Sequence, residues 1–266
     1  MRILAAQVAA VALIAACTAG SAASSPSAAA TNLTIFGAAS LKGALEEAKP
    51  AYESSHPGIT LTLSTDSSSV LEAQIEQGAP ADVFLSADAS NPRKLVDGGF
   101  ASGDAIDFAG NELTIIVPSD NPAGVTTPAD LARSGLKVIA AGDGVPITTY
   151  ATQLVDGLAR EPGYPAGFAA AYAANIVSKE DNVKAVVAKI ELGEGDAGIV
   201  YVTDAAAAST GIKTIDVPDA ANVRATYAGV VVEASPHRDA AKAFLDWFAG
   251  PDGQRILSSF GFLPQP

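Results

Sequence analysis

The 266-residue chain has little of the side-chain chemistry on which most enzyme active sites depend. It contains one cysteine and two histidines, His56 and His237. One cysteine excludes an internal disulfide, and neither histidine has a partner at the spacing of a zinc site. The chain also lacks a G-x-S-x-G elbow and a phosphate-binding P-loop, and its G-x-G-x-x-G match at 193–198 precedes a predicted strand rather than a helix. We therefore expect that it is not an enzyme and that it holds no cofactor and no metal ion.

Basic residues are scarce as well. The chain has 16 lysines and arginines against 29 acidic residues, for a net charge of −13. This balance argues against binding of nucleic acid and against electrostatic docking on anionic membranes. It does not argue against a small anion as the ligand, because backbone dipoles can bind an anion locally. The length suits one large domain or two small ones.

The N-terminus carries the chain's targeting signal. An apolar run follows Met1-Arg2 and ends at Cys17, and it is too short to span a bilayer comfortably. It resembles the bacterial lipoprotein signal, in which the cysteine becomes the new N-terminus and carries lipid. We predict a signal peptide over 1–16, lipid on Cys17 and a flexible tether over 17–32, which is small and polar. The alternatives are a buried free cysteine and an ordered N-terminal arm.

From residue 33 onward, strand and helix patterns alternate along the chain. This alternation predicts an α/β fold with mostly parallel strands and helices covering the sheet faces. Predicted strands lie at 33–38, 59–64, 82–87, 113–117, 136–141, 198–202, 212–217 and 227–233. Predicted helices lie at 41–49, 70–78, 92–97, 147–160, 183–193, 236–249 and 252–260.

Hydroxyl groups and helix starts coincide at several strand-to-helix junctions. Ser40 follows the first predicted strand, and Ser67 to Ser69 follow the second. The turn at 145–147 and Val183 begin two later helices. Ligands of open α/β sheets bind at such junctions, and each helix start offers unpaired N–H donors. A single serine here would be explained as a helix cap, whereas several junctions meeting in one crevice would form an anion site.

Five segments together resemble one family, the molybdate-binding proteins of bacterial ABC transporters. The run GAPADVFLSAD is the most specific of them, and the resemblance extends over nearly all of residues 33–263. The segments are 38–41 (AASL), 67–75 (SSSVLEAQI), 78–88 (GAPADVFLSAD), 180–183 (EDNV) and 198–205 (GIVYVTDA).

The resemblance implies the type II periplasmic-binding-protein fold. This fold has two lobes, each a mixed sheet flanked by helices, joined by crossing strands. Lobe 1 is expected to comprise 33–112 plus 228–266, and lobe 2 is expected to comprise 113–227. We expect the crossings near 113–117 and 225–230, and we expect hinge closure around the ligand.

The resemblance also implies the ligand, the site and the partners. The ligand is expected to be molybdate or tungstate, delivered to an ABC permease of the inner or cytoplasmic membrane. The protein is expected to be a monomer held outside the cytoplasm by lipid. Carried over residue by residue, the oxyanion site consists of hydroxyl and backbone donors of Ser40 and Ser68, backbone N–H groups of Ile147 and Val183, and the Tyr201 phenol.

Other functions remain open on the sequence. A receptor for sulfate or another tetrahedral oxyanion is the nearest alternative. A secreted serine hydrolase would use Ser40 or Ser68 as nucleophile, but it needs a base, and neither histidine lies beside Ser40 or Ser68 in the sequence. A surface lipoprotein without a ligand is a third possibility. Asp66 stands where a small apolar residue is frequent in the family, and we expect its carboxylate to turn away from the cleft or to cap the helix.

Overall fold

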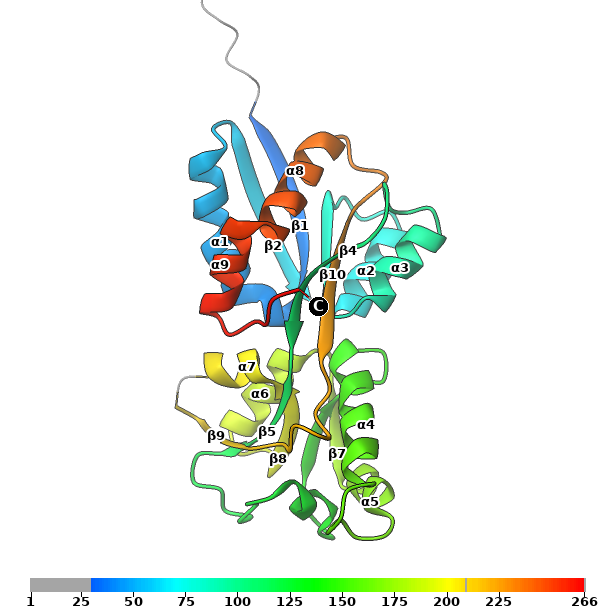
Figure 1. Cartoon of the computed structure of the whole chain (residues 1–266), viewed down its shortest axis with the longest axis vertical. Helices are drawn as coiled ribbons and strands as arrows, with labels where there is room; N and C mark the ends of the chain where they lie inside the picture. The colour runs from blue at the N-terminus through cyan, green and yellow to red at the C-terminus, as the bar shows by residue number, and fades with distance from the viewer. Residues whose placement is uncertain (1–29, 209, 266) are drawn as a thin grey trace, which may run out of the picture.

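The computed structural model describes residues 30–208 and 210–265. The predicted signal peptide, Cys17 and most of the predicted tether lie outside these residues. The described residues form two five-stranded sheets, each at the centre of its own lobe (Figure 1). None of their helices combines the length and the apolar character needed to cross a membrane.

Lobe 1 is built on a mixed sheet with the strand order β2-β1-β3-β10-β4. Strand β1 pairs in parallel with β2 and β3, and β10 pairs antiparallel with β3 and β4. The strands are β1 (Thr31–Ala38), β2 (Ile59–Asp66), β3 (Val83–Ser86), β4 (Ile106–Asn111) and β10 (Ala225–Val231). The helices are η1 (Ala39–Leu41), α1 (Lys42–Ser55), α2 (Ser68–Glu76), α3 (Ser90–Asp97), α8 (Arg238–Ala249) and α9 (Pro251–Ser259).

Lobe 2 repeats the plan with the strand order β7-β6-β8-β5-β9. Strand β6 pairs in parallel with β7 and β8, and β5 pairs antiparallel with β8 and β9. The strands are β5 (Leu113–Pro118), β6 (Val138–Ala141), β7 (Ile176–Glu180), β8 (Ala197–Tyr201) and β9 (Ile212–Ile215). The helices are η2 (Pro128–Ala132), α4 (Pro146–Leu158), α5 (Phe168–Ala174), α6 (Val183–Glu191) and α7 (Val202–Ala207). The predicted fold of two mixed sheets flanked by helices is confirmed.

Two extended segments connect the lobes. Only Glu112 separates β4 in lobe 1 from β5 in lobe 2, and the chain returns ahead of β10. The two segments bond to each other, because Asn222 Oδ1 accepts from the Leu113 N–H at 3.2 Å and Asn222 Nδ2 donates to the Leu113 carbonyl at 3.0 Å. Strands β1 and β10 begin at Thr31 and Ala225, ahead of residues 33 and 228, where the sequence analysis places those boundaries.

Helix α1 is longer than the sequence predicts. The predicted helix ends at residue 49, just before Pro50, yet the observed helix continues to Ser55. Its second half is held by Tyr52, whose buried ring lies edge-on to Phe244 and Trp247 at centroid separations of 5.0 and 5.1 Å. This packing outweighs the loss of one helical hydrogen bond at the proline.

Two strands and two α-helices, together with the short 3-10 helix η2, were not predicted from the sequence, and the strands and α-helices have local reasons. Strand β7 is an edge strand with charged residues, and β4 contains glycine and aspartate, so neither shows a clear strand pattern. Helices α5 and α7 are only 7 and 6 residues long. These elements depend on packing against their neighbours rather than on a strong local pattern.

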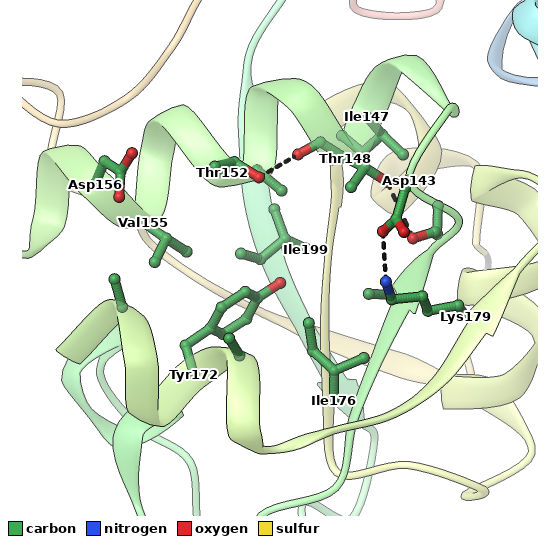
Figure 2. Close-up of a pocket in the computed structure, with 15 residues that line it drawn as sticks. Asp143, Ile147, Thr148, Thr152, Val155, Asp156, Tyr172, Ile176, Lys179 and Ile199 are labelled. Atoms are coloured by element: carbon green, nitrogen blue, oxygen red, sulfur yellow. Dashed lines mark hydrogen bonds and ion pairs between the residues drawn. The ribbon is translucent and has the colours of Figure 1, made fainter. Parts of the chain in front are cut away.

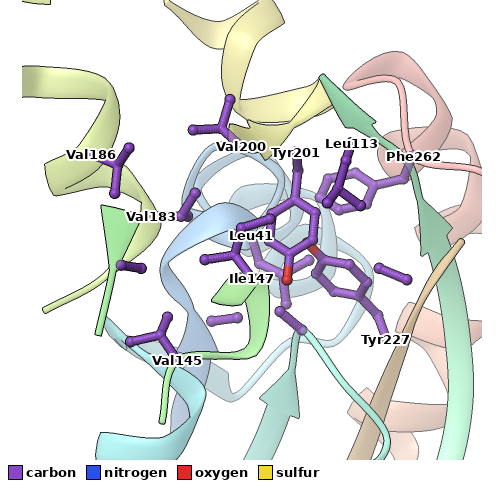
Figure 3. Close-up of a cluster of buried hydrophobic side chains, with 14 of the residues drawn as sticks. Leu41, Leu113, Val145, Ile147, Val183, Val186, Val200, Tyr201, Tyr227 and Phe262 are labelled. Carbon is purple, nitrogen blue, oxygen red and sulfur yellow. The ribbon is translucent and has the colours of Figure 1, made fainter. Parts of the chain in front are cut away.

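The apolar core runs through both lobes without a break. Where the lobes meet, Leu41 of lobe 1 packs with Val145, Ile147 and Val183 of lobe 2 (Figure 3). The side chains of Ile147 and Val183 are therefore core residues. Their burial places the first turns of α4 and α6 at the boundary between the lobes.

Candidate functional site

All five predicted ligand residues line one narrow pocket between the lobes. Ser40 and Ser68 reach it from lobe 1, and Ile147, Val183 and Tyr201 reach it from lobe 2. They are spread over more than 160 positions of the chain, so only the fold brings them together.

Four strand-to-helix junctions build this pocket. Strands β1 and β2 end at η1 and α2, whereas β6 and β7 end at the loops that precede α4 and α6. Each pair of strands runs in parallel, so both carboxyl ends lie at the same edge of their sheet. The first N–H groups of every helix lack partners within that helix and carry its positive dipole end. The pocket is thus surrounded by backbone donors.

Ser68 is better placed than its neighbours to donate to a ligand. Its hydroxyl oxygen accepts the Ala87 N–H at 3.0 Å, so its hydrogen is available for a bound group. Ser67 and Ser69 instead bond to each other through their hydroxyl oxygens at 2.8 Å. This pattern supports the choice of Ser68 in the serine triplet.

A chain of hydrogen bonds orients Ser40. Asn111 Nδ2 donates to Tyr227 Oη at 3.4 Å, and Tyr227 Oη lies 2.9 Å from Ser40 Oγ. Either hydroxyl of this pair can be the donor, and when Tyr227 donates to Ser40 Oγ the Ser40 hydrogen is free for a group in the pocket. Burial raises the pKa of Tyr227 well above its ordinary value, which keeps the phenol protonated in this role.

Tyr201 carries the clearest signal for a ligand. Its side chain is 1% exposed, and its hydroxyl has no hydrogen-bond partner among the described residues. Burial raises the pKa of this phenol well above its ordinary value, so it remains a donor. A buried polar group without a partner is costly, and most such groups in native proteins are satisfied. The unpartnered hydroxyl of Tyr201, which is drawn in Figure 3, therefore indicates that a ligand binds in the pocket.

The pocket carries no charge of its own. None of the described residues that line it is acidic or basic. Lys184, next to Val183, is paired with the fully buried carboxylate of Asp204 at 2.8 Å. Asp66 does not line the pocket, but its carboxylate is not turned away from the cleft: it accepts the Ser67 N–H at 2.7 Å and the Asn182 Nδ2 hydrogen of lobe 2 at 3.2 Å.

Neither histidine reaches the site. The His56 ring stacks on Tyr52 at a centroid separation of 3.9 Å, and His237 directly precedes α8. A serine hydrolase at this pocket would therefore lack a histidine base. Within the described ranges, no group of three or more histidine, cysteine or acidic side chains is placed to hold a metal ion.

Two residues of the site were not predicted from the sequence. Asn182 lines the pocket as the N-cap of α6, and its Oδ1 accepts the Ala185 N–H at 3.1 Å. Tyr227 orients Ser40 from β10, and no local pattern distinguishes it from other strand residues. Asn182 could have been found, because it precedes Val183 in the EDNV segment at a helix start.

Comparison with known proteins agrees with this geometry. Residues 33–263 match the family described as bacterial extracellular solute-binding protein. The chain belongs to this family. The resemblance predicted from the sequence is confirmed by relatives that are themselves molybdate-binding proteins.

Three relatives illustrate the similarity. The molybdate-binding protein ModA of Mycobacterium tuberculosis is 32% identical over 255 residues, which cover 95% of this chain and 93% of the relative. The putative ABC transporter substrate-binding lipoprotein YvgL of Bacillus subtilis is 32% identical over 235 residues, covering 86% and 85%. The solved periplasmic molybdate-binding protein of Azotobacter vinelandii has a TM-score of 0.73 at 26% identity, covering 88% of this chain and all of that one.

This solute-binding protein has a second cavity, of about 180 Å³, within lobe 2 (Figure 2). It lies between α4 and α5 and is lined mostly by apolar side chains, with the Asp143–Lys179 ion pair at its edge. Tyr172, Asp156, Thr148 and Thr152 also line it, and the two threonine hydroxyls donate to backbone carbonyls. Without converging donors, this cavity does not suit an anion.

We predict that two buried tyrosines differ in what their hydroxyls contribute to stability. Tyr227→Phe should lower the free energy of unfolding of the ligand-free protein by about 1–2 kcal/mol, because Ser40 and Asn111 lose a partner. Tyr201→Phe should instead raise it by about 1–3 kcal/mol, because the variant removes a buried hydroxyl that has no partner in the ligand-free protein. Urea unfolding of both variants measures this. Equal losses in the two variants would contradict the unpartnered state of the Tyr201 hydroxyl.

Proposed function

We propose that this solute-binding protein is an extracytoplasmic receptor for molybdate or tungstate that delivers the anion to an ABC importer. The observation that carries the proposal is the uncharged interlobe pocket, where helix starts and hydroxyls converge around the unpartnered Tyr201 phenol. The names of its relatives support the same ligand.

Hydrogen bonds from neutral groups are sufficient to hold a dianion. Each hydrogen bond to a charged group contributes roughly 1.5–3 kcal/mol, and the pocket offers several donors. Hydrogen phosphate carries its own O–H and would find no free acceptor among these donors. Sulfate has no proton either, so it is rejected only by its smaller size. Molybdate and tungstate are nearly equal in size, and both should bind.

The proposal includes the protein's partners. The protein acts as a monomeric binding protein, without enzymatic activity and without a resident cofactor. Closure of the lobes around the anion presents both lobes to the permease in one fixed arrangement, which allows the permease to recognise the loaded form. Lipid on Cys17 holds the protein at the outer face of the membrane.

We predict that anions separate into two groups by their effect on thermal unfolding. Molybdate and tungstate at millimolar concentration should raise the melting temperature of the full chain strongly, because a ligand at a hundred times its Kd adds about 2.7 kcal/mol of stability. Sulfate and hydrogen phosphate should raise it little. A large rise with sulfate would favour the sulfate-receptor alternative, and no rise with any anion would contradict an oxyanion function.

We predict that Tyr201→Phe weakens molybdate binding about ten- to a hundredfold, because one hydrogen bond to a charged group is lost. The matched control is Tyr172→Phe, which removes another largely buried tyrosine hydroxyl, in the second cavity of lobe 2. Isothermal titration calorimetry should show wild-type affinity for the control. Equal affinity of the Tyr201 variant and the wild type would exclude Tyr201 from the site.

We predict that the native N-terminus is a lipid-modified Cys17. Cys17→Ala should release the protein from the membrane fraction, because the lipid supplies the membrane affinity. Mass spectrometry of the protein from membranes should show a chain that begins at residue 17 with added acyl mass. An unmodified chain that retains Met1 would contradict the anchor.

A further inference from the structure

One carboxylate links the two lobes beside the pocket. Asp66 is the last residue of β2 in lobe 1, and its Oδ1 accepts the Asn182 Nδ2 hydrogen from lobe 2 at 3.2 Å. The same oxygen accepts the Ser67 N–H at 2.7 Å. Asp66 therefore joins the residue that precedes α2 to the residue that precedes α6.

The side-chain amide of Asn182 has only one orientation that satisfies its partners. Its Oδ1 accepts the Ala185 N–H at 3.1 Å, and its Nδ2 donates to Asp66. Turning the amide around would place an oxygen against the carboxylate and an NH₂ group against a backbone N–H. The Asp66 carboxylate thus holds Asn182 in the orientation that caps α6.

These contacts lie directly beside the proposed ligand donors. Ser67 and Asn182 both line the pocket, and each is followed by a proposed donor, Ser68 or Val183. The lobes also approach at a second point nearby, since a Cβ atom added at Gly144 would lie 3.7 Å from Ser69 Oγ. The Asp66–Asn182 bond is therefore part of the contact that the two lobes make on this side of the pocket.

A carboxylate near a dianion also has a cost. Asp66 would repel bound molybdate, but it is partly exposed and outside the pocket lining, so solvent and salt screen the repulsion. Its hydrogen bond to Asn182 requires the lobes to be in contact. An interaction made only in the closed arrangement favours closure and slows the escape of the ligand.

We propose that Asp66 is a positioning residue for closure. Through Asn182, it holds the first turn of α6 against lobe 1, so that the Val183 N–H remains directed at the bound oxyanion. The effect on molybdate rests on the proposed function, whereas the link between the lobes requires no ligand.

Three single variants of the full chain test this link. Asp66→Ala removes the acceptor, whereas Asp66→Asn keeps an amide oxygen in its place. Asn182→Ser keeps an N-cap oxygen for α6 but removes the donor to Asp66. The double variant Asp66→Ala/Asn182→Ser measures whether the two residues act through each other.

We predict that loss of the Asp66–Asn182 hydrogen bond speeds the release of molybdate. In stopped-flow measurements, Asp66→Ala and Asn182→Ser should each raise koff about five- to tenfold with little change in kon, as expected for one hydrogen bond. Asp66→Asn should stay within about twofold of the wild type. The koff of the double variant should not exceed the larger koff of the two single variants. Unchanged or slower release from Asp66→Ala, or additive effects in the double variant, would overturn the proposal.

Hydrogen exchange of the ligand-free chain provides a test that needs no anion. Asp66→Ala in lobe 1 should raise amide exchange in the first turn of α6 in lobe 2, and Asp66→Asn should not. If exchange in α6 rises in Asp66→Ala but the wild-type protein binds no molybdate, the link stands and the proposed function fails. If exchange in α6 does not respond while the wild type binds molybdate, the link fails and the function stands.

Discussion

The unpaired N–H groups at helix starts are the feature on which the site depends. A helix leaves its first donors without partners in its own backbone. In this protein η1, α2, α4 and α6 all begin at one pocket, because two parallel strand pairs end there from opposite lobes. Such a concentration of donors suits an anion and does not require a basic side chain. Because the site needs no basic side chain, an anion can bind to a chain whose net charge is −13.

The crossing segments determine how this arrangement can form and open. The donors belong to two lobes, so the pocket is complete only when the lobes meet. The segments that join them bond to each other through Asn222 and Leu113, and Asn111 at the crossing bonds to Thr203 of lobe 2 at 2.8 Å. The connection is therefore a paired element rather than a loose linker. Paired crossings of this kind favour hinge closure, in which each lobe moves as a unit.

Much of the fold could be predicted from the sequence, and the reasons for the failures are physical. Most strands showed local patterns, whereas β7 and α5 are short elements that depend on packing against lobe 2. The helix through Pro50 could not be foreseen, because the aromatic contacts of Tyr52 come from α8. The site residues were predicted by resemblance, and their convergence required the fold. Tyr227 was missed because its role is set by Ser40, a residue far away in sequence.

The directions of the hydrogen bonds bear on which anion the pocket accepts. A serine or tyrosine oxygen is also an acceptor, so a pocket of hydroxyls does not by itself reject a protonated anion. Here, however, Ser68 Oγ already accepts the Ala87 N–H, and Ser40 Oγ is bonded to Tyr227. The protonated Tyr201 phenol and the backbone N–H groups are donors. A bound anion with its own O–H would have to donate to the remaining lone pair of a hydroxyl oxygen, so it would accept one hydrogen bond fewer from the pocket, at a cost of about 1–3 kcal/mol. A fully deprotonated dianion has no such cost, which favours molybdate over hydrogen phosphate without any difference in net charge.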